Sequence, residues 1–366
     1  MKFGMTPLNG AEGAVLAHSV RHAGGVFKKG RVLSAGDIGA LAAAGLTQVM
    51  AARLEPGDVA EDRAAGALAR AAAADRALAA EPFTGRANIY ADAHGLALID
   101  VERIDAVNRI DESLTIATVP NYQVVEPKQM LATVKIIPFA VSETVLESAL
   151  GLCCEGGLVR VAPFAHHEVG LVLTELPQTK PQILDKSVQA IDTRLMALGS
   201  SLGEVVRCTH EVDAVAEAVR AAHGQGCGLV LVFGASAIVD RGDVVPAGLE
   251  AAGGEVIHLG MPVDPGNLMM LGRLGETPVI GAPSCARSPK VNGFDWVLQR
   301  VLAGVPVGPD DVMAMGAGGL LKEIPSRPSP RGRPEEAVVA KAPSIAALIL
   351  AAGQSRRMGD ANKLLA

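Results

Sequence analysis

Residues 158–319 alternate between short apolar runs and amphipathic segments, and this alternation constrains the fold more than any other feature of the sequence. The apolar runs lie at 158–164, 170–176, 228–236, 255–261 and 277–284. The segments 185–201, 210–226 and 241–254 have helical periodicity, and each ends at Gly or at a pair of Ser. Strands that alternate with helices predict βαβ units around a mainly parallel sheet, whose ligands bind beyond the carboxyl ends of the strands.

The residues before this region predict smaller α+β segments. A hairpin is followed by an Ala/Leu-rich helix, which Ser34 caps, Asp37 favours electrostatically and Gly45 ends, and then by a strand. Residues 59–81 are almost all helix formers and predict a further helix. Strand signals follow, with a short helix at 100–111. We expect an α+β segment at 1–82, a β-rich segment at 83–150, a three-layer α/β/α domain at 151–321, a Pro-rich linker at 322–343 and the start of another domain at 344–366.

Composition limits the class of protein. The chain has 366 residues, of which 49% are hydrophobic, and a net charge of -6, which does not suit a nucleic-acid-binding surface. Its five cysteines include no C-x-x-C pair, so neither a disulfide framework nor a zinc site is expected. No signal peptide and no run of about 18 apolar residues is present, so we expect a cytoplasmic protein with no membrane partner.

Two loops that follow predicted strands are candidates for ligand binding. In the loop 233–245, Gly234 lets a ligand approach the backbone, Ser236 suits a phosphate, and Asp240 and Asp243 suit a metal or a ring nitrogen. A tight turn capped by an Asp is the alternative for this loop. The loop 260–272 contains two Pro, a Gly and an Asp-Pro pair, a rigidity that suits binding and also suits a structural corner.

The loop 281–298 carries the strongest local signal. Hydroxyl groups and cations collect there just before a predicted helix, whose N-terminus favours anions. We interpret Cys285 as a small buried or half-buried residue, because the sequence places no histidine partner beside it. The groups that suit an anion are Ser284, Arg287, Ser288, Lys290 and Asn292.

The histidines near these loops are interpreted as structural. The pair His166 and His167 lacks a third metal ligand at a set spacing, so surface positions are expected. His210 lies where a strand ends and a helix cap begins. We therefore leave all three out of the predicted site.

Taken in order, these motifs resemble the molybdopterin-binding domain of molybdenum cofactor biosynthesis over residues 158–319. The earlier segments resemble, more loosely, those that precede this domain in the molybdopterin molybdenumtransferase family. The family's Thr-Gly-Asp-Glu run is reduced to Thr174-Glu175, and its Lys-Pro-Gly-Lys-Pro loop appears at 262–267 without either Lys. The resemblance implies that molybdopterin or its molybdenum form is the ligand. Asp240 and Asp243 are the candidate metal residues, and they would hold Mg²⁺ or molybdate if this domain itself is catalytic. The implied cofactor-binding residues are Thr174, Glu175, Gly234, Ser236, Asp240, Asp243, Pro262, Asp264, Gly266, Ser284, Arg287, Ser288 and Lys290.

Residues 345–366 resemble the Leu-Ala-Ala-Gly-x-Ser-x-Arg-Met-Gly opening of nucleotidyltransferases of the cofactor guanylyl- or cytidylyltransferase type. Because the sequence stops shortly after this motif, we expect a fragment or a truncated product that is inactive in nucleotidyl transfer. The resemblance implies CTP, with GTP left open, and Mg²⁺ for the parent protein. The implied nucleotide-binding residues are Ala351, Ala352, Gly353, Ser355, Arg357, Gly359 and Lys363.

Three hypotheses follow, and no catalytic residue is assigned in any of them. In the first, residues 1–320 bind molybdopterin and present it to a fused cytidylyltransferase. In the second, the 151–321 domain itself catalyses adenylylation of molybdopterin or molybdate insertion, but the missing Gly-Asp and Lys residues favour the first. In the third, the parent is a nucleotidyltransferase for a substrate that is not a pterin. A molybdoenzyme or its chaperone and a second copy of the chain are the partners that the resemblance implies.

Overall fold

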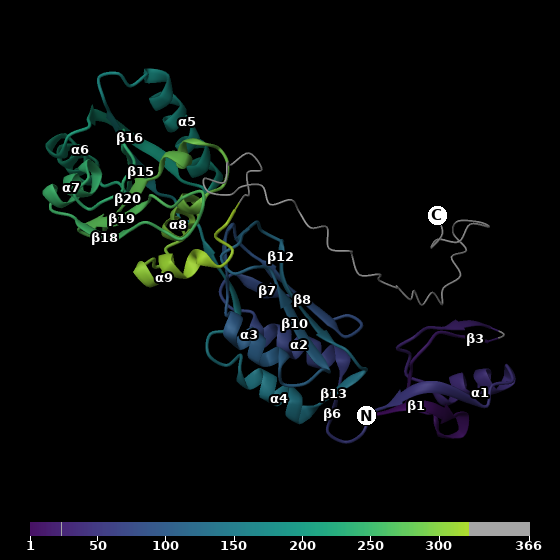
Figure 1. Ribbon diagram of the computed structural model, residues 1–366. Helices are drawn as coiled ribbons and strands as arrows, with labels where there is room; N and C mark the ends of the chain where they lie inside the picture. Colours follow the sequence, from purple (N-terminus) through teal and green to yellow (C-terminus); the bar gives the residue numbers. More distant parts are fainter. Residues whose placement is uncertain (23, 322–366) are drawn as a thin grey trace, which may run out of the picture. The chain divides into compact units, whose positions relative to one another are not determined.

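The computed structural model describes residues 1–22 and 24–321, and Figure 1 shows the order of the elements along the chain. The N-terminal residues form a small three-stranded antiparallel sheet, in the order β1-β5-β2, with the predicted hairpin and helix. Ser34 caps the helix α1 in a capping box with Asp37, and Gly45 follows it with a φ of 80°, so this prediction is confirmed. The elements are β1 (Lys2–Pro7), η1 (Leu8–Gly10), β2 (Val15–Leu16), β3 (Val20–His22), β4 (Gly25–Phe27), α1 (Ala35–Ala43) and β5 (Gln48–Arg53).

The second part of the chain, from β6 to β14, has one hydrophobic cluster. This cluster extends from Ala64 to Val161 and so crosses the boundary expected at residue 82. The helix expected over 59–81 is shorter than predicted, because its two ends pair as the strands β6 and β7. The elements are β6 (Asp58–Ala60), α2 (Glu61–Ala72), β7 (Ala77–Ala79), β8 (Arg86–Ala91), β9 (Gly95–Ile99), α3 (Val101–Asn108), β10 (Leu114–Thr118), β11 (Val124–Val125), β12 (Met130–Ile136), β13 (Ala140–Ser142), α4 (Glu143–Gly151) and β14 (Val159–Pro163).

The third part is built on a six-stranded mixed sheet in the order β16-β15-β17-β20-β19-β18. The strands β16, β15, β17 and β20 are parallel, whereas β19 is antiparallel to both of its neighbours. The run 158–164, expected in this sheet, pairs instead with β9. The elements are β15 (Glu168–Glu175), α5 (Pro181–Ala197), β16 (Ser201–Thr209), α6 (Val212–Gly224), β17 (Leu229–Phe233), α7 (Val244–Ala251), β18 (Glu255–Leu259), β19 (Met270–Leu274), β20 (Thr277–Ala282), η2 (Ser284–Arg287), α8 (Gly293–Leu302), α9 (Pro309–Met313) and η3 (Ala314–Gly316).

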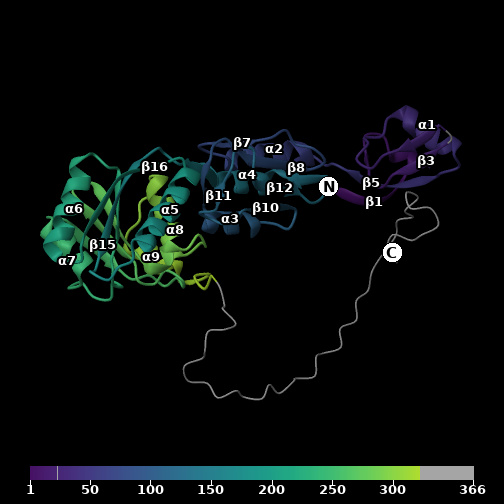
Figure 2. The ribbon, with the colours of Figure 1, turned by 90° about the horizontal axis from the view of Figure 1, so that it is seen from above.

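Helices cover both faces of this sheet, which explains why its central strands are continuous apolar runs. All five residues of β17 are buried, as expected for a parallel strand with both faces covered. One cluster joins the sheet to α5 and α8, and another joins it to α6 and α7. Figure 2 shows these two pairs of helices on opposite sides of β15. No described helix has both the length and the apolar character needed to cross a membrane.

The strand order reverses at β15. The chain passes from β15 through α5 to β16 on one side, and then through α6 to β17 on the other side of β15. In open α/β sheets such a reversal leaves a crevice beyond the carboxyl ends of the strands, where ligands bind. Residues that follow β15, β16 and β17 therefore lie at the point where the topology favours a site.

Candidate functional site

A chain of hydrogen bonds joins the carboxyl ends of the three strands at this reversal. Thr174 Oγ1, at the end of β15, lies 2.8 Å from His210 Nδ1, which follows β16. His210 Nε2 lies 2.8 Å from Ser236 Oγ, which follows β17. Thr174 is 1% exposed and also accepts the backbone N–H of Ala235 at 2.7 Å. We call Thr174, His210 and Ser236 the relay.

The hydrogen-bond partners of Thr174 decide which proton His210 carries. Since Oγ1 already accepts the Ala235 N–H, its own hydroxyl hydrogen is satisfied only by donating to His210 Nδ1. In the neutral ring Nε2 then carries the hydrogen and donates to Ser236 Oγ. The opposite tautomer would leave a buried hydroxyl hydrogen without an acceptor, which costs about 1–3 kcal/mol. Ser236 therefore keeps its own hydroxyl hydrogen free to donate to a ligand.

Burial also favours the neutral ring of His210. It lowers the pKa of His210, and the nearby carboxylate of Asp243 opposes this shift only in part. A protonated ring would donate from Nδ1 to Thr174 and take away the acceptor of the buried hydroxyl group. The relay thus behaves as a neutral donor chain that ends at Ser236.

A cavity of about 150 Å³ lies beside Ser236, and we call it the Arg287 cavity. Its walls come from the residues after β17, from Leu268 and from the loop after β20. Within the described part of the chain, no acceptor takes the backbone N–H groups of Ser236, Ala237 and Ile238. Consecutive free N–H groups in a turn form a concave site for an anion. The lining residues are Gly234, Ala235, Ser236, Ala237, Ile238, Leu268, Ala282, Pro283, Ser284 and Arg287.

Arg287 brings a positive charge to this cavity. One of its terminal nitrogens donates to Gly234 O at 3.0 Å, and its guanidinium carbon lies 5.6 Å from the ring centre of Phe233. Its Nε is buried, and no described residue accepts a hydrogen bond from it. Burial lowers the pKa of Arg287, since no carboxylate among the described residues compensates its charge. An anionic ligand would supply the missing partner.

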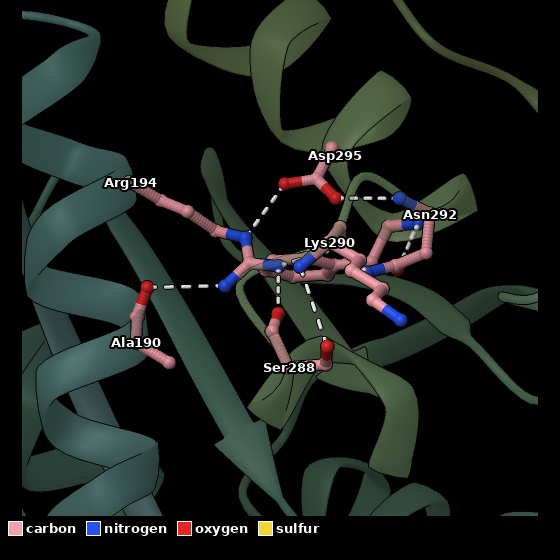
Figure 3. Close-up of polar contacts among 7 residues, drawn as sticks. Ala190, Arg194, Ser288, Lys290, Asn292 and Asp295 are labelled. Carbon is pink, nitrogen blue, oxygen red and sulfur yellow. Dashed lines mark hydrogen bonds and ion pairs between the residues drawn. The ribbon is translucent and has the colours of Figure 1, made fainter.

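Arg194 of α5 holds the loop 288–292, which directly follows Arg287, as Figure 3 shows. Arg194 Nε lies 2.6 Å from Asp295 Oδ1, and a terminal nitrogen donates to the carbonyl groups of Ser288 and Lys290. Asp295 in turn accepts the backbone N–H of Asn292 at 2.8 Å and completes the capping box of α8. These contacts fix the loop 288–292 without using any group that faces the cavity.

Several predicted residues do not line the Arg287 cavity. Asp264 N and O bond to Gly319 and Leu321, and Gly266 lies against the backbone at Gly293. Lys290 is exposed, and Ser288 Oγ accepts its backbone N–H. The loop 260–269 therefore packs on the start of α8 in the described structure. The predicted residues outside the lining are Thr174, Glu175, Asp240, Asp243, Pro262, Asp264, Gly266, Ser288 and Lys290, of which Thr174 reaches the site through the relay.

The described residues do not support the predicted Mg²⁺ site. Asp243 Oδ2 accepts the N–H groups of Val239 and Asp240, and these bonds lower the pKa of Asp243. Asp240 Oδ1 accepts the N–H of Gly242. Over residues 1–22 and 24–321, no three His, Cys, Asp or Glu side chains come together in a way that could hold a metal ion. The two carboxylates accept hydrogen bonds from N–H groups of their own turn. Asp243 occupies the N-cap position of α7, as the alternative interpretation expected, but its side chain makes no capping hydrogen bond within the described residues.

The other expectations have mixed outcomes. His210 was interpreted as structural, but it is the central member of the relay. Cys285 is half-buried, as expected, and burial raises the pKa of its thiol. His166 is exposed and contacts the carbonyl group of Gly199. The predicted nucleotide-binding residues, Ala351 to Lys363, lie outside the described residues.

Comparison with known proteins adds little to this description. Residues 5–53 match a family described as a domain of unknown function, DUF8806, which covers most of the N-terminal sheet. No curated protein sequence matches the chain. A crystal structure of the molybdopterin biosynthesis MoeA protein from Pyrococcus horikosii is 12% identical, with a TM-score of 0.31, and the match covers 83% of this chain and 75% of that one. This TM-score is too low to carry an argument.

Proposed function

We propose that the 151–321 domain binds a small molecule through its phosphate group, and that this molecule is molybdopterin or its molybdenum form. The observation that carries the first half is that one cavity brings together three free N–H groups, those of Ser236, Ala237 and Ile238, and the guanidinium of Arg287. The Nε of this guanidinium has no hydrogen-bond partner among the described residues. The motif order along residues 158–319 supports the second half, because it resembles the molybdopterin-binding domain.

The size of the Arg287 cavity fits the anionic end of such a ligand. A volume of about 150 Å³ is below the range of about 300–1,000 Å³ that encloses a whole drug-sized molecule. The phosphate would accept from Ser236, from the free N–H groups and from Arg287, while the ring extends beyond the cavity. Each of these groups donates a hydrogen bond, so the site favours an acceptor-only group such as phosphate over a neutral one.

Titration calorimetry of the full chain with molybdopterin, under anaerobic conditions, tests this function. Replacing Arg287→Met should weaken binding about 10- to 100-fold, because a hydrogen bond to a charged group contributes about 1.5–3 kcal/mol. Arg241→Met is the matched control: Arg241 lies in the loop after β17 but donates to Val256 O and does not line the cavity. Equal affinity of the two variants, or no binding by the unmodified chain at tens of micromolar, would refute the proposal.

The second hypothesis, catalysis by this domain itself, predicts turnover that depends on ATP or molybdate. The relay favours the binding role, since its tautomer makes Ser236 a donor and leaves no basic nitrogen beside its hydroxyl group. Turnover by the full chain with molybdopterin and either ATP or molybdate would favour catalysis by this domain over a binding role. Transfer from CTP and the cytoplasmic location remain expectations from the sequence.

A further inference from the structure

A second cavity, of about 540 Å³, lies between the loop at Tyr122 and the helices α8 and α9, and we call it the Arg300 cavity. Its walls belong to the compact unit Met1–Lys322. It shares no lining residue with the Arg287 cavity. Its volume lies within the range of about 300–1,000 Å³ that encloses a small organic molecule.

Arg300 lines this cavity and is 8% exposed. Its Nε is buried without a hydrogen-bond partner, and no carboxylate lies within 4 Å of its guanidinium among the described residues. Burial lowers the pKa of Arg300, and Tyr122 and Asp311, which line the same cavity, offset this only in part. A buried cation is normally paired, so the missing partner points to an anion that enters the cavity.

Two aromatic residues line this cavity. The ring of Tyr122 stacks on the guanidinium with its centre 3.7 Å from the central carbon, and Trp296 lines the same cavity. Tyr122 has a φ of 62°, a conformation that a bulky residue seldom adopts, and its backbone N–H is held by Ala97 O. The loop thus accepts an unfavourable backbone conformation at the residue that covers Arg300.

We propose that the Arg300 cavity binds an organic anion with a planar ring, which Arg300 holds by its carboxylate or phosphate group. The ring would lie along the side chains of Trp296 and Tyr122, as flat ligands do on aromatic residues. Amide side chains of Gln123 and Gln299 at the same cavity supply donors and acceptors for the ring edge. This site is separate from the Arg287 cavity, and it does not depend on the function proposed there.

The chain offers a specific reporter, since Trp296 is its only tryptophan. Guanosine monophosphate serves as a phosphate-bearing probe and 6-carboxypterin as a carboxylate-bearing probe. Guanosine and unsubstituted pterin are their uncharged counterparts. Each is titrated into the full chain while Trp296 fluorescence is followed, with calorimetry to exclude absorption by the probe.

At least one anionic probe should bind and change the fluorescence of Trp296, with an affinity at least tenfold above that of its uncharged counterpart. Arg300→Met should reduce that affinity at least tenfold, whereas Arg241→Met, at a residue that lines neither cavity, should leave it unchanged. Ala314→Phe is a second variant, because it fills the cavity from an exposed wall and leaves Arg300 in place. It should also abolish binding, which keeps the test decisive if the Arg300 variant fails to fold.

Three results would overturn the proposal. One is equal binding of a charged probe and its uncharged counterpart, and another is binding by neither anionic probe. The third is an unchanged affinity in folded Ala314→Phe, which would place the bound probe elsewhere. The relative affinity of the two anionic probes then identifies phosphate or carboxylate as the preferred group.

Discussion

Arg194 and Asp295 form an ion pair between α5 and α8, 101 residues apart in the sequence, with 2.6 Å between Nε and Oδ1. Their side chains are 10% and 9% exposed, so the pair is almost shielded from water. Because Arg194 also holds the carbonyl groups of Ser288 and Lys290, this pair supports the loop that carries Arg287. The position of the Arg287 guanidinium therefore depends on an ion pair that does not itself line the cavity.

Arg194→Met should destabilise the protein by about 3 kcal/mol, because it leaves the Asp295 carboxylate buried without its partner. Arg207→Met is the matched control, since Arg207 pairs with Asp185 at 2.7 Å on the surface and should contribute about 1 kcal/mol or less. Urea unfolding followed by Trp296 fluorescence measures both. Equal losses would show that the Arg194 pair has no special role.

Thr174→Val should cost about 1–3 kcal/mol, because it leaves the Ala235 N–H and His210 Nδ1 without partners. Thr174→Ser keeps the hydroxyl group and should lose less than about 1 kcal/mol. Nitrogen NMR of the His210 ring should show the hydrogen on Nε2 in the unmodified chain. A hydrogen on Nδ1 there would contradict the tautomer assigned to the relay.

The stability of the chain should fall on mild acidification through His210. Its folded pKa is lowered by burial, so below the unfolded value of about 6.5 the unfolded state binds more protons. The contribution of His210 to the free energy of unfolding is therefore complete above about pH 6.5, and it is lost as the pH falls through the folded pKa. The difference in unfolding free energy between the unmodified chain and His210→Gln, from about pH 7.5 to about pH 5, should shrink toward acid. A difference that stays constant with pH would show that His210 does not cause the loss of stability in acid.

Gly266→Ala should destabilise the protein more than Gly253→Ala. Both glycines have a positive φ, of 141° and 91°, so each alanine carries a conformational penalty. Only the Cβ at Gly266 meets backbone, 2.7 Å from Gly293 N, and this clash should add about 1–3 kcal/mol. Differential scanning calorimetry of the two variants measures this difference as a lower melting temperature of Gly266→Ala. Similar melting temperatures would mean that the loop 260–269 moves to accommodate the added Cβ at little cost.

The central strands and the helix caps were predictable from sequence, because their signals are local. The apolar runs of β15, β17 and β20 are buried on both faces, so they differ sharply from their surroundings. β7 was missed because its Ala-rich sequence favours a helix, and pairing with β8 overrides that preference. β19 was missed because it lies in a Met-rich stretch that was interpreted as loop.

The site was predictable only in part. Ser236, Ser284 and Arg287 follow buried strands and were identified from that position. His210 was not, because β16 is an edge strand without a continuous buried face, and the sequence does not show that its end lies beside β15. The hydrogen bonds of Asp240 and Asp243 to N–H groups of their own turn depend on the fold of that turn, and composition does not distinguish this role from metal binding.

The relay takes one residue from the carboxyl end of each of three parallel strands: Thr174 lies in β15, His210 directly follows β16, and Ser236 lies in the loop after β17. A ligand that binds Ser236 therefore also stabilises the association of β16, β15 and β17, because the relay links the ends of these strands. At a concentration 100-fold above its Kd it would add about 2.7 kcal/mol to the resistance of these strands to separation. Ligand binding should therefore slow the hydrogen exchange of backbone amides along β16, an edge strand of the sheet, including amides far from the ligand.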